Sequence, residues 1–125
     1  MSAETELNAA LLAAGTVTSI VGAGNAARIF PELVPLDNAR PAIAYSRTGT
    51  EYTTTIHSMT PVGEETTLDI WCMAGTKVAA DALADVVIPA IGAAGFRIVA
   101  RASVMPDPER DLIATSLTVV KYRNI

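Results

Sequence analysis

An alternating segment that leads directly into a helical one places the strongest constraint on how this chain can fold. Residues 66–73 alternate between apolar and polar, which is the period of a β-strand with one buried face. In residues 76–91 the apolar side chains instead recur at the spacing of one helix face, and Lys77, Asp81 and Asp85 form a polar stripe. The sequence therefore predicts a strand followed by an amphipathic helix that lies on the sheet.

Segments on both sides carry helix and strand signals of their own. Residues 4–14 show helical spacing with acidic residues in the first turn, and Gly15 is expected to end this helix. Thr16 is expected to cap a second, shorter helix that reaches Val21. The remaining prediction is a brief edge segment at 27–31, a proline-rich loop at 32–40, and strands at 42–48, 96–104 and 112–122.

This order of elements predicts an α+β fold, in which an antiparallel β-sheet carries helices packed on one face. The last two strands are joined by a short turn at 105–111, so they are most simply antiparallel. We expect residues 1–125 to form a single domain. Aromatic residues make up only 5% of the chain, so the core must be built from smaller aliphatic side chains and could gain stability from a partner surface.

The polar, threonine-rich stretch 49–65 has two interpretations. It can form an extended hairpin, or it can be a mobile loop between two strands. Stretches of this length inside a small domain are more often functional than incidental. Both interpretations therefore point to the same segment as a candidate for contact with a partner.

Charge and composition argue against several classes of function. The net charge of -4 does not suit a protein that grips nucleic acid through a basic surface. No apolar run approaches the roughly 20 residues that cross a bilayer, and the amino end lacks the layout of a signal peptide. One Cys and one His can form neither an internal disulfide nor, without several carboxylates, a zinc site. No membrane association, metal or cofactor is expected.

Cys72 is the strongest candidate for a nucleophile, and His57 is its conceivable partner. A strand-to-helix nucleophile needs small flanking residues, whereas Trp71 and Met73 flank Cys72. Cys72 is also in phase with Leu68, on the face expected to pack under the helix. A buried cysteine that acts as a small apolar side chain is therefore the favoured interpretation.

Trp71 then points to the opposite face of the sheet, together with Thr67 and Asp69. No predicted helix covers that face, and exposed tryptophans are enriched at protein interfaces. The alternative is that Trp71 lies over neighbouring strands of its own sheet. Both interpretations stay open at this point.

Basic residues gather on the last two predicted strands. Alternation puts Arg97 and Arg101 on one face of their strand, and Lys121 and Arg123 end the final strand. These four side chains can line a basic surface or pair with acids, and a solvated face is the default expectation.

The order of several short motifs resembles the tail-completion, or tail-terminator, proteins of long-tailed bacteriophages and gene-transfer particles. The motifs are "LNAALLAAGTVTSIVG", "ARIFPELVP", "RPAIAYSRTGT", "ETTLDIWCMAGTKVAADALADVV" and "ERDLIATSLTVVKYRNI". The resemblance covers nearly the whole chain. The sequence departs from the pattern at "GAGNAA" before Arg28 and at Pro89 within the predicted helix.

The resemblance implies a structural virion protein and not an enzyme. Family members form a six-membered ring on the head-proximal end of the tail tube, end tube polymerisation, and join the tail to the head connector or stopper protein. The resemblance also implies that genomic double-stranded DNA passes through the ring without specific binding. The expected location is the neck region of the virion, after assembly in the host cytoplasm.

Two groups of residues are the candidate contacts. Thr67, Asp69 and Trp71 are expected to form a subunit-subunit or ring-tube contact. The segment 49–63 is expected to reach the tube or connector, through Tyr52, Thr53, Thr54, Thr55, Ile56 and His57. The alternative functions are another neck or head-completion component and a small thiol enzyme that uses Cys72 and His57.

Overall fold

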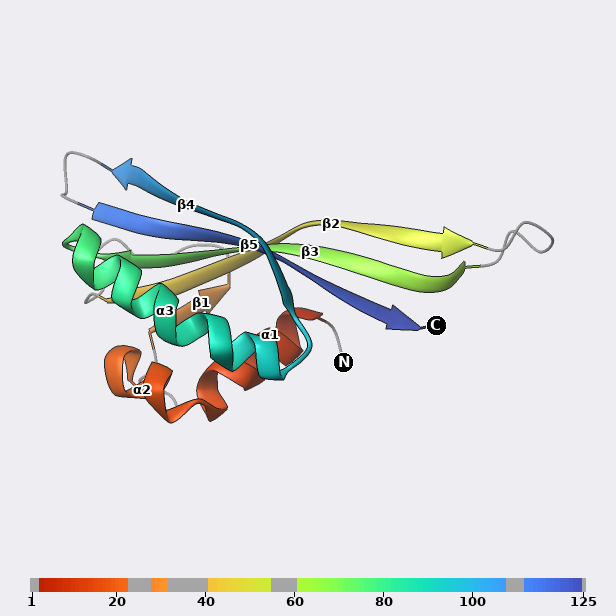
Figure 1. Cartoon of the computed structure of the whole chain (residues 1–125), viewed down its shortest axis with the longest axis horizontal. Coiled ribbons are helices and arrows are strands. Elements are labelled where there is room, and N and C mark those ends of the chain that lie inside the picture. Colours follow the sequence, from red (N-terminus) through yellow and green to blue (C-terminus); the bar gives the residue numbers. More distant parts are fainter. Residues whose placement is uncertain (1–2, 23–27, 32–40, 55–60, 108–111, 125) are drawn as a thin grey trace.

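The alternation around residues 66–73 belongs to a much longer strand, β3 (Pro61–Ala74), at the centre of the sheet (Figure 1). The computed structural model describes residues 3–22, 28–31, 41–54, 61–107 and 112–124. Within them the chain forms helices α1 (Ala3–Ala13), α2 (Gly15–Val21) and α3 (Lys77–Ala93), and strands β1 (Ile29–Pro31), β2 (Ala42–Thr54), β3, β4 (Arg97–Asp107) and β5 (Leu112–Asn124).

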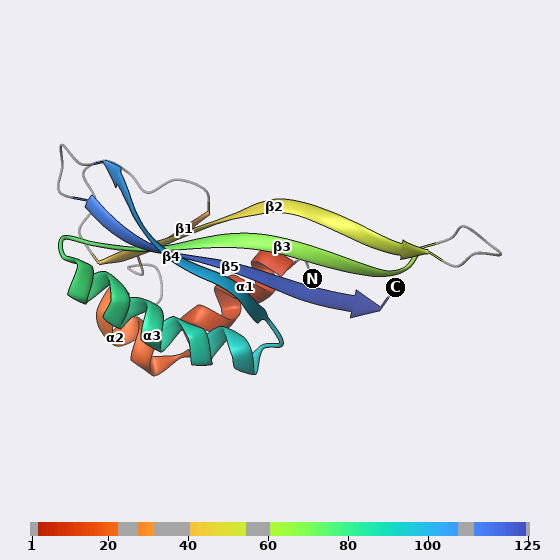
Figure 2. The ribbon, with the colours of Figure 1, turned by 45° about the horizontal axis from the view of Figure 1, so that its top comes forward.

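The strands form a five-stranded sheet in the order β1-β2-β3-β5-β4. β1 runs parallel to β2, and the other neighbouring pairs are antiparallel. All three described helices lie on the same face of this sheet, as the two ribbon views show (Figures 1 and 2). The predicted α+β architecture is therefore confirmed, with the short β1 as its parallel exception.

The core lies between that face and the helices. Leu68, Ile70 and Cys72 of β3 are buried in it, so the predicted direction of Cys72 is correct. Small aliphatic residues supply most of the core, as the composition requires. Its largest fully buried side chains are Leu7, Leu11, Ile43, Leu68, Ile70, Leu83, Ile91, Leu117, Val17, Val21, Val87 and Val119.

A capping hydrogen bond at the start of helix α3 and a glycine just beyond its end explain its bounds. The Thr76 side chain accepts a hydrogen bond from the Ala79 N–H at 3.2 Å, which caps the first turn. The helix continues through Pro89 to Ala93, two residues past the predicted end. It closes where Gly95 adopts a φ of 94°, a conformation that glycine enters without steric cost.

The junction of the first two helices differs from the prediction. Gly15 begins α2 and does not end α1, and the break falls on the extended residue Ala14. No side chain caps α2, so the predicted role of Thr16 is wrong. The apolar positions give the physical reason, because a break at Ala14 lets both Leu11 and Val17 reach the core.

Arg28 ties the second helix to the edge of the sheet. Its Nε donates to the Pro41 carbonyl and its Nη2 to the Ile20 carbonyl, both at 2.8 Å. Its backbone carbonyl accepts from the Ile43 N–H. The brief edge segment predicted from the sequence is thereby held beside β2 as β1.

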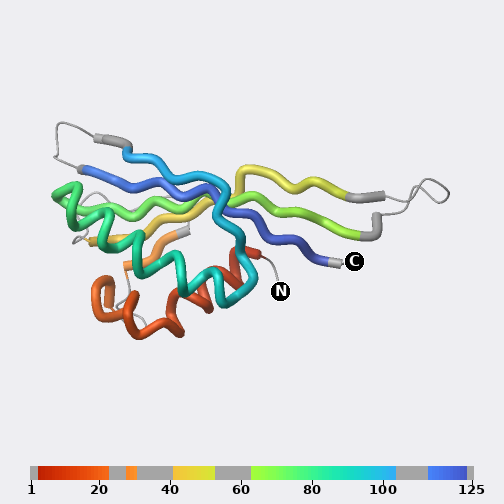
Figure 3. Tube along the Cα trace, in the orientation of Figure 1, coloured from red at the N-terminus to blue at the C-terminus, as the bar shows by residue number. Residues whose placement is uncertain are grey.

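The stretch 49–65 is an extended hairpin in its described parts. β2 continues to Thr54 and β3 starts at Pro61, and the two pair along this length. Figures 1 and 3 show β2, β3 and the end of β5 extending well beyond the helices. We call residues 49–54, 61–66 and 120–124 the arm.

Candidate interaction surfaces

The sheet face opposite the helices bears the residues singled out around Trp71. Strand register aligns Ala44, Trp71 and Ser116 across β2, β3 and β5, and aligns Asp69 with Thr118. Because alternate residues point to opposite faces, Thr67, Asp69 and Trp71 share the face that no described helix covers. We call it the open face.

Trp71 is half-buried on the open face. It packs against Ala44, Met73 and Ala114, which are buried. The tryptophan therefore does lie over strands of its own sheet, which was the alternative interpretation, while part of its surface stays accessible. Beside it, the Thr118 hydroxyl donates a hydrogen bond to Asp69 Oδ1 at 3.1 Å.

The arm carries three of the predicted contact residues, Tyr52, Thr53 and Thr54. Tyr52 points to the helix side of the sheet and is 59% exposed. Thr55, Ile56 and His57 lie outside the described residues. The prediction that these six residues make contacts stays a prediction.

Gly63 and Tyr122 form a contact within the arm that the alternation of the strands does not predict. A Cβ on Gly63 would lie 2.1 Å from the Tyr122 hydroxyl oxygen, so the ring occupies the space that a side chain would need. The two residues belong to neighbouring strands, with Gly63 paired to Asn124 and Tyr122 to Glu65. Such a diagonal contact of an aromatic ring with a glycine compensates for the missing side chain in a strand.

Ion pairs join the base of the arm to helix α1. Glu4 pairs with Arg47, and Glu6 pairs with Lys121 and Arg123. A hydrogen bond from Lys121, together with its charge, lowers the pKa of Glu6 below its ordinary value. The basic residues at the end of β5 therefore pair with acids, which was one of the two options.

Arg97 and Arg101 do not share a face, so that prediction is wrong. A bulge between Ile98 and Ala100 inserts one residue into β4 and reverses the alternation. Arg97 pairs with Val120 and lies on the open face, whereas Arg101 pairs with Leu117 and lies on the helix side. Sequence periodicity cannot reveal a bulge, because the extra residue shows only in the pairing.

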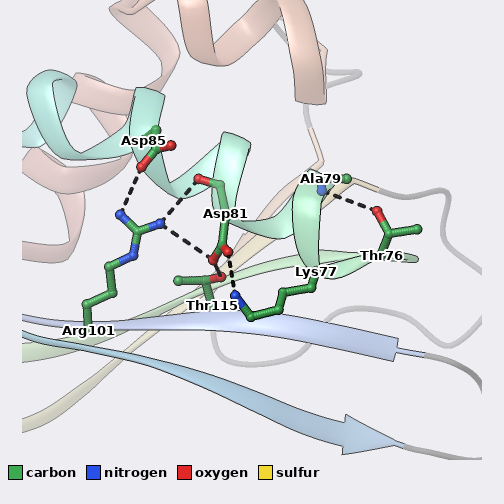
Figure 4. A network of polar contacts seen from close by, with 7 residues as sticks. All are labelled: Thr76, Lys77, Ala79, Asp81, Asp85, Arg101 and Thr115. Carbon is green, nitrogen blue, oxygen red and sulfur yellow. Dashed lines mark hydrogen bonds and ion pairs between the residues drawn. The ribbon is translucent and has the colours of Figure 1, made fainter.

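Arg101 joins a polar network that fastens α3 to the sheet (Figure 4). It donates to Asp85 Oδ1 at 2.9 Å and reaches Asp81 on its other side. Asp81 also accepts from Lys77 Nζ at 2.9 Å and from the Thr115 hydroxyl at 2.7 Å. Hydrogen bonds from Lys77 and then Thr115 lower the pKa of Asp81 to about 2. The sequence shows Lys77, Asp81 and Asp85 as the polar stripe of an amphipathic helix, but it does not predict their contacts with Arg101 and Thr115.

The environment of Cys72 does not suit an activated thiol. Its side chain is fully buried among apolar residues, and this burial raises the pKa of the thiol to about 12. Nucleophilic cysteines instead have a lowered pKa. Within the described ranges, no group of three or more His, Cys, Asp or Glu residues could hold a metal ion, and no helix is long and apolar enough to span a membrane.

Comparisons with known proteins agree with this architecture. The family model described as "Tail completion protein gp17" matches residues 5–121. A solved structure described as the virion of a native gene transfer agent particle contains a chain with a TM-score of 0.71 and 15% sequence identity to this one, covering 99% of this chain and 96% of that chain. At this identity the likeness shows a shared fold. Among curated proteins no significant match is found.

Proposed function

Because the chain belongs to the tail completion protein gp17 family, we propose that it forms a hexameric ring on the head-proximal end of a phage-type tail tube. The ring ends tube polymerisation and joins the tail to the connector or stopper protein of the head. In the virion it occupies the neck region of the tail. The observation that carries this proposal is the family match, which spans both the helix-covered half of the sheet and the arm.

The one-sided architecture supports assembly into a ring. A ring with rotational symmetry needs two different surfaces on each subunit, because one copy contacts the next through unlike patches. The helix layer, the open face and the projecting arm supply such unlike surfaces (Figure 2). The likeness in fold to a chain in a gene transfer agent virion fits this role.

The candidate contact residues divide between two of these surfaces. We assign Thr67, Asp69 and Trp71 on the open face to a subunit-subunit or ring-tube contact. We assign the arm, with Tyr52, Thr53 and Thr54 and the segment that bears Thr55, Ile56 and His57, to contact with the tube or the connector. The accessible part of Trp71 supports the first assignment, and the exposure of Tyr52 supports the second.

Charge supports a passive relation to the genome. The net charge of -4 suits a ring through which double-stranded DNA passes without specific binding.

Joining of purified components tests the proposal directly. Tail tubes assembled without this protein should grow beyond normal length and fail to join heads, and addition of the purified chain should restore joining. Electron microscopy gives tail length, ring copy number and the fraction of joined particles. Tubes of normal length that join heads in the absence of the protein would refute the proposal.

Trp71→Ala is the matched test of the open face. Joining should fall while the fold is kept, because the residue is only half-buried. Thr118→Ala, which removes the hydrogen bond to Asp69 on the same face, tests whether the position of Asp69 also matters for joining. Unchanged ring size and joining with Trp71→Ala would remove Trp71 from the interface.

Two alternatives make different predictions. Another neck or head-completion component would be located by microscopy at a position other than the end of the tube. A thiol enzyme would carry a reactive Cys72, whereas the buried thiol with its raised pKa should resist iodoacetamide until the protein unfolds. Rapid alkylation of the folded chain would favour the enzyme.

A further inference from the structure

The sheet has two edges without a partner strand among the described residues. β4 is the last strand of the sheet, so its outer edge is unpaired. On the other side, β1 covers only positions 43–45 of β2, and among the described residues the edge of β2 from Ser46 to Thr54 has no partner strand. Free edges present unpaired backbone N–H and C=O groups and readily accept another strand.

Strand direction makes these two edges compatible in a ring. β2, β3, β5 and β4 alternate in direction, so β2 and β4 run in opposite senses. If the next copy in the ring is related to the first by rotation about an axis parallel to the strands, every strand keeps its direction. The β2 edge of one copy then lies antiparallel to the β4 edge of the next copy, and antiparallel is the better hydrogen-bonded arrangement.

The two edges also carry opposite charges that have no partner within the described chain. Glu51 lies on the free edge of β2, opposite Glu65, and therefore faces the open side. Arg97 faces the same side because of the bulge in β4. Within the described ranges neither side chain makes an ion pair, whereas the neighbouring Arg47 and Arg101 are paired with Glu4 and with Asp81 and Asp85.

Exposed side chains with large apolar surfaces lie near both of these edges. Tyr52 is on the free edge of β2, and Val99, 49% exposed, is at the bulge of β4. Tyr122, 53% exposed, lines a cleft with Arg97, Glu65, Gly95 and Val120. This cleft lies beside the start of β4, where a carboxylate from an added strand would meet the Arg97 guanidinium.

We propose that neighbouring copies of this chain join by antiparallel pairing of the β2 edge with the β4 edge, with Glu51 of one copy opposite Arg97 of the next. This register sets residues 46–51 against 97–102, and the pairing must end there because β1 occupies positions 43–45, so β4 has to diverge from the neighbouring β2 beyond Ala102. It also sets Arg47 opposite Arg101, and each of these charges is paired with acids of its own copy. The inference rests on the proposed ring, and it identifies the contact that closes the ring.

Charge reversal tests this contact. Glu51→Arg and Arg97→Glu each place like charges across the interface, and each should raise the concentration needed for half-assembly by about tenfold or more. The combined variant restores an opposite pair and should recover assembly. Lys77→Glu, a reversal of the same size as Arg97→Glu but on α3, should leave assembly unchanged. Light scattering measures assembly, electron microscopy identifies rings, and circular dichroism confirms that each variant is folded.

A cysteine pair gives an independent measurement. Oxidation of Glu51→Cys with Arg97→Cys should produce a covalent ladder up to the size of the ring, because Cys72 is buried and the new thiols lie at the edges. The control pair, Glu51→Cys with Lys77→Cys, should stay monomeric under denaturing conditions.

The outcomes separate this inference from the proposed function. If the unaltered protein forms rings and completes tails, but both single reversals assemble equally well or the 51–97 pair does not cross-link, the edge contact is wrong and the function stands. If the unaltered protein forms no ring, both proposals fail.

Discussion

The helix-covered half of the sheet and the arm are built from the same three strands, β2, β3 and β5, but they are held by different interactions. In the covered half, side chains such as Ile43, Leu68 and Leu117 are removed from water beneath α1 and α3. In the arm, Glu6 holds Lys121 and Arg123, and Tyr122 covers Gly63. Burial of apolar side chains therefore fixes one end of each strand, whereas ion pairs and the contact between Tyr122 and Gly63 fix the other end.

Because the two regions are held differently, the stability of the fold and the contacts with partners depend on different residues. Burial of a large aliphatic side chain contributes about 1.5–3 kcal/mol, whereas an exposed ion pair contributes about 0–1 kcal/mol. The covered half therefore supplies most of the folding free energy. Changes in the arm can alter contacts with partners without unfolding the chain.

The largest expected effect is the loss of a core side chain from the covered half. Leu117→Ala removes a fully buried side chain at the centre of β5 and should lower the free energy of unfolding by about 2–5 kcal/mol. Urea unfolding measures this change. Glu51→Ala, in the exposed part of β2, is the matched control and should change stability by less than about 0.5 kcal/mol. Equal losses from the two variants would contradict the division between core and arm.

The covered half was the more predictable region. Alternation in residues 66–73 and helical spacing in 76–91 identified the core faces of β3 and α3, because burial enforces those periods over many residues. The direction of Cys72 followed from the same pattern. The junction of α1 and α2 was harder to predict. Gly15 indicates a helix end, whereas the break falls one residue earlier, at Ala14, where both Leu11 and Val17 can reach the core.

The arm and the edge strand could be predicted only in part. A polar, threonine-rich stretch does not distinguish a hairpin from a loop, because neither face of such a hairpin has to be apolar. The bulge at Val99 moved Arg97 to the open face and left Arg101 to bond Asp85, which no alternation pattern could reveal. Gly63 carried a weak signal, as a glycine within a strand often marks the close approach of another group.

A smaller effect is expected from the glycine contact in the arm. Gly63→Ala places a methyl group where the Tyr122 ring lies, and the ring must move away. Because Tyr122 is exposed and can rotate outward, the cost should be about 1 kcal/mol. A double-mutant cycle with Tyr122→Ala provides the control, since Gly63→Ala should cost much less once the ring is absent. If the losses in unfolding free energy of the two single variants simply add in the double variant, the Tyr122 ring does not depend on the glycine.

The smallest expected effect is a change in acid sensitivity at the junction of α3 with the sheet. The pKa of Asp81 is about 2 in the folded protein, below its ordinary value of 3.8, because Lys77 and then Thr115 donate hydrogen bonds to the carboxylate. A lowered pKa means that the unfolded chain binds the proton more readily, so the stabilisation is complete above about pH 4 and is lost as the pH falls towards 2.

In Asp81→Asn this contribution is absent at every pH. The difference in thermal midpoint between the two proteins should therefore be constant near neutral pH and shrink between pH 4 and pH 2. Glu6, whose pKa is also lowered, is present in both proteins, so its contribution cancels in the comparison. Scanning calorimetry across this range measures the difference, and a constant gap down to pH 2 would show that Asp81 does not stabilise the junction through its charge.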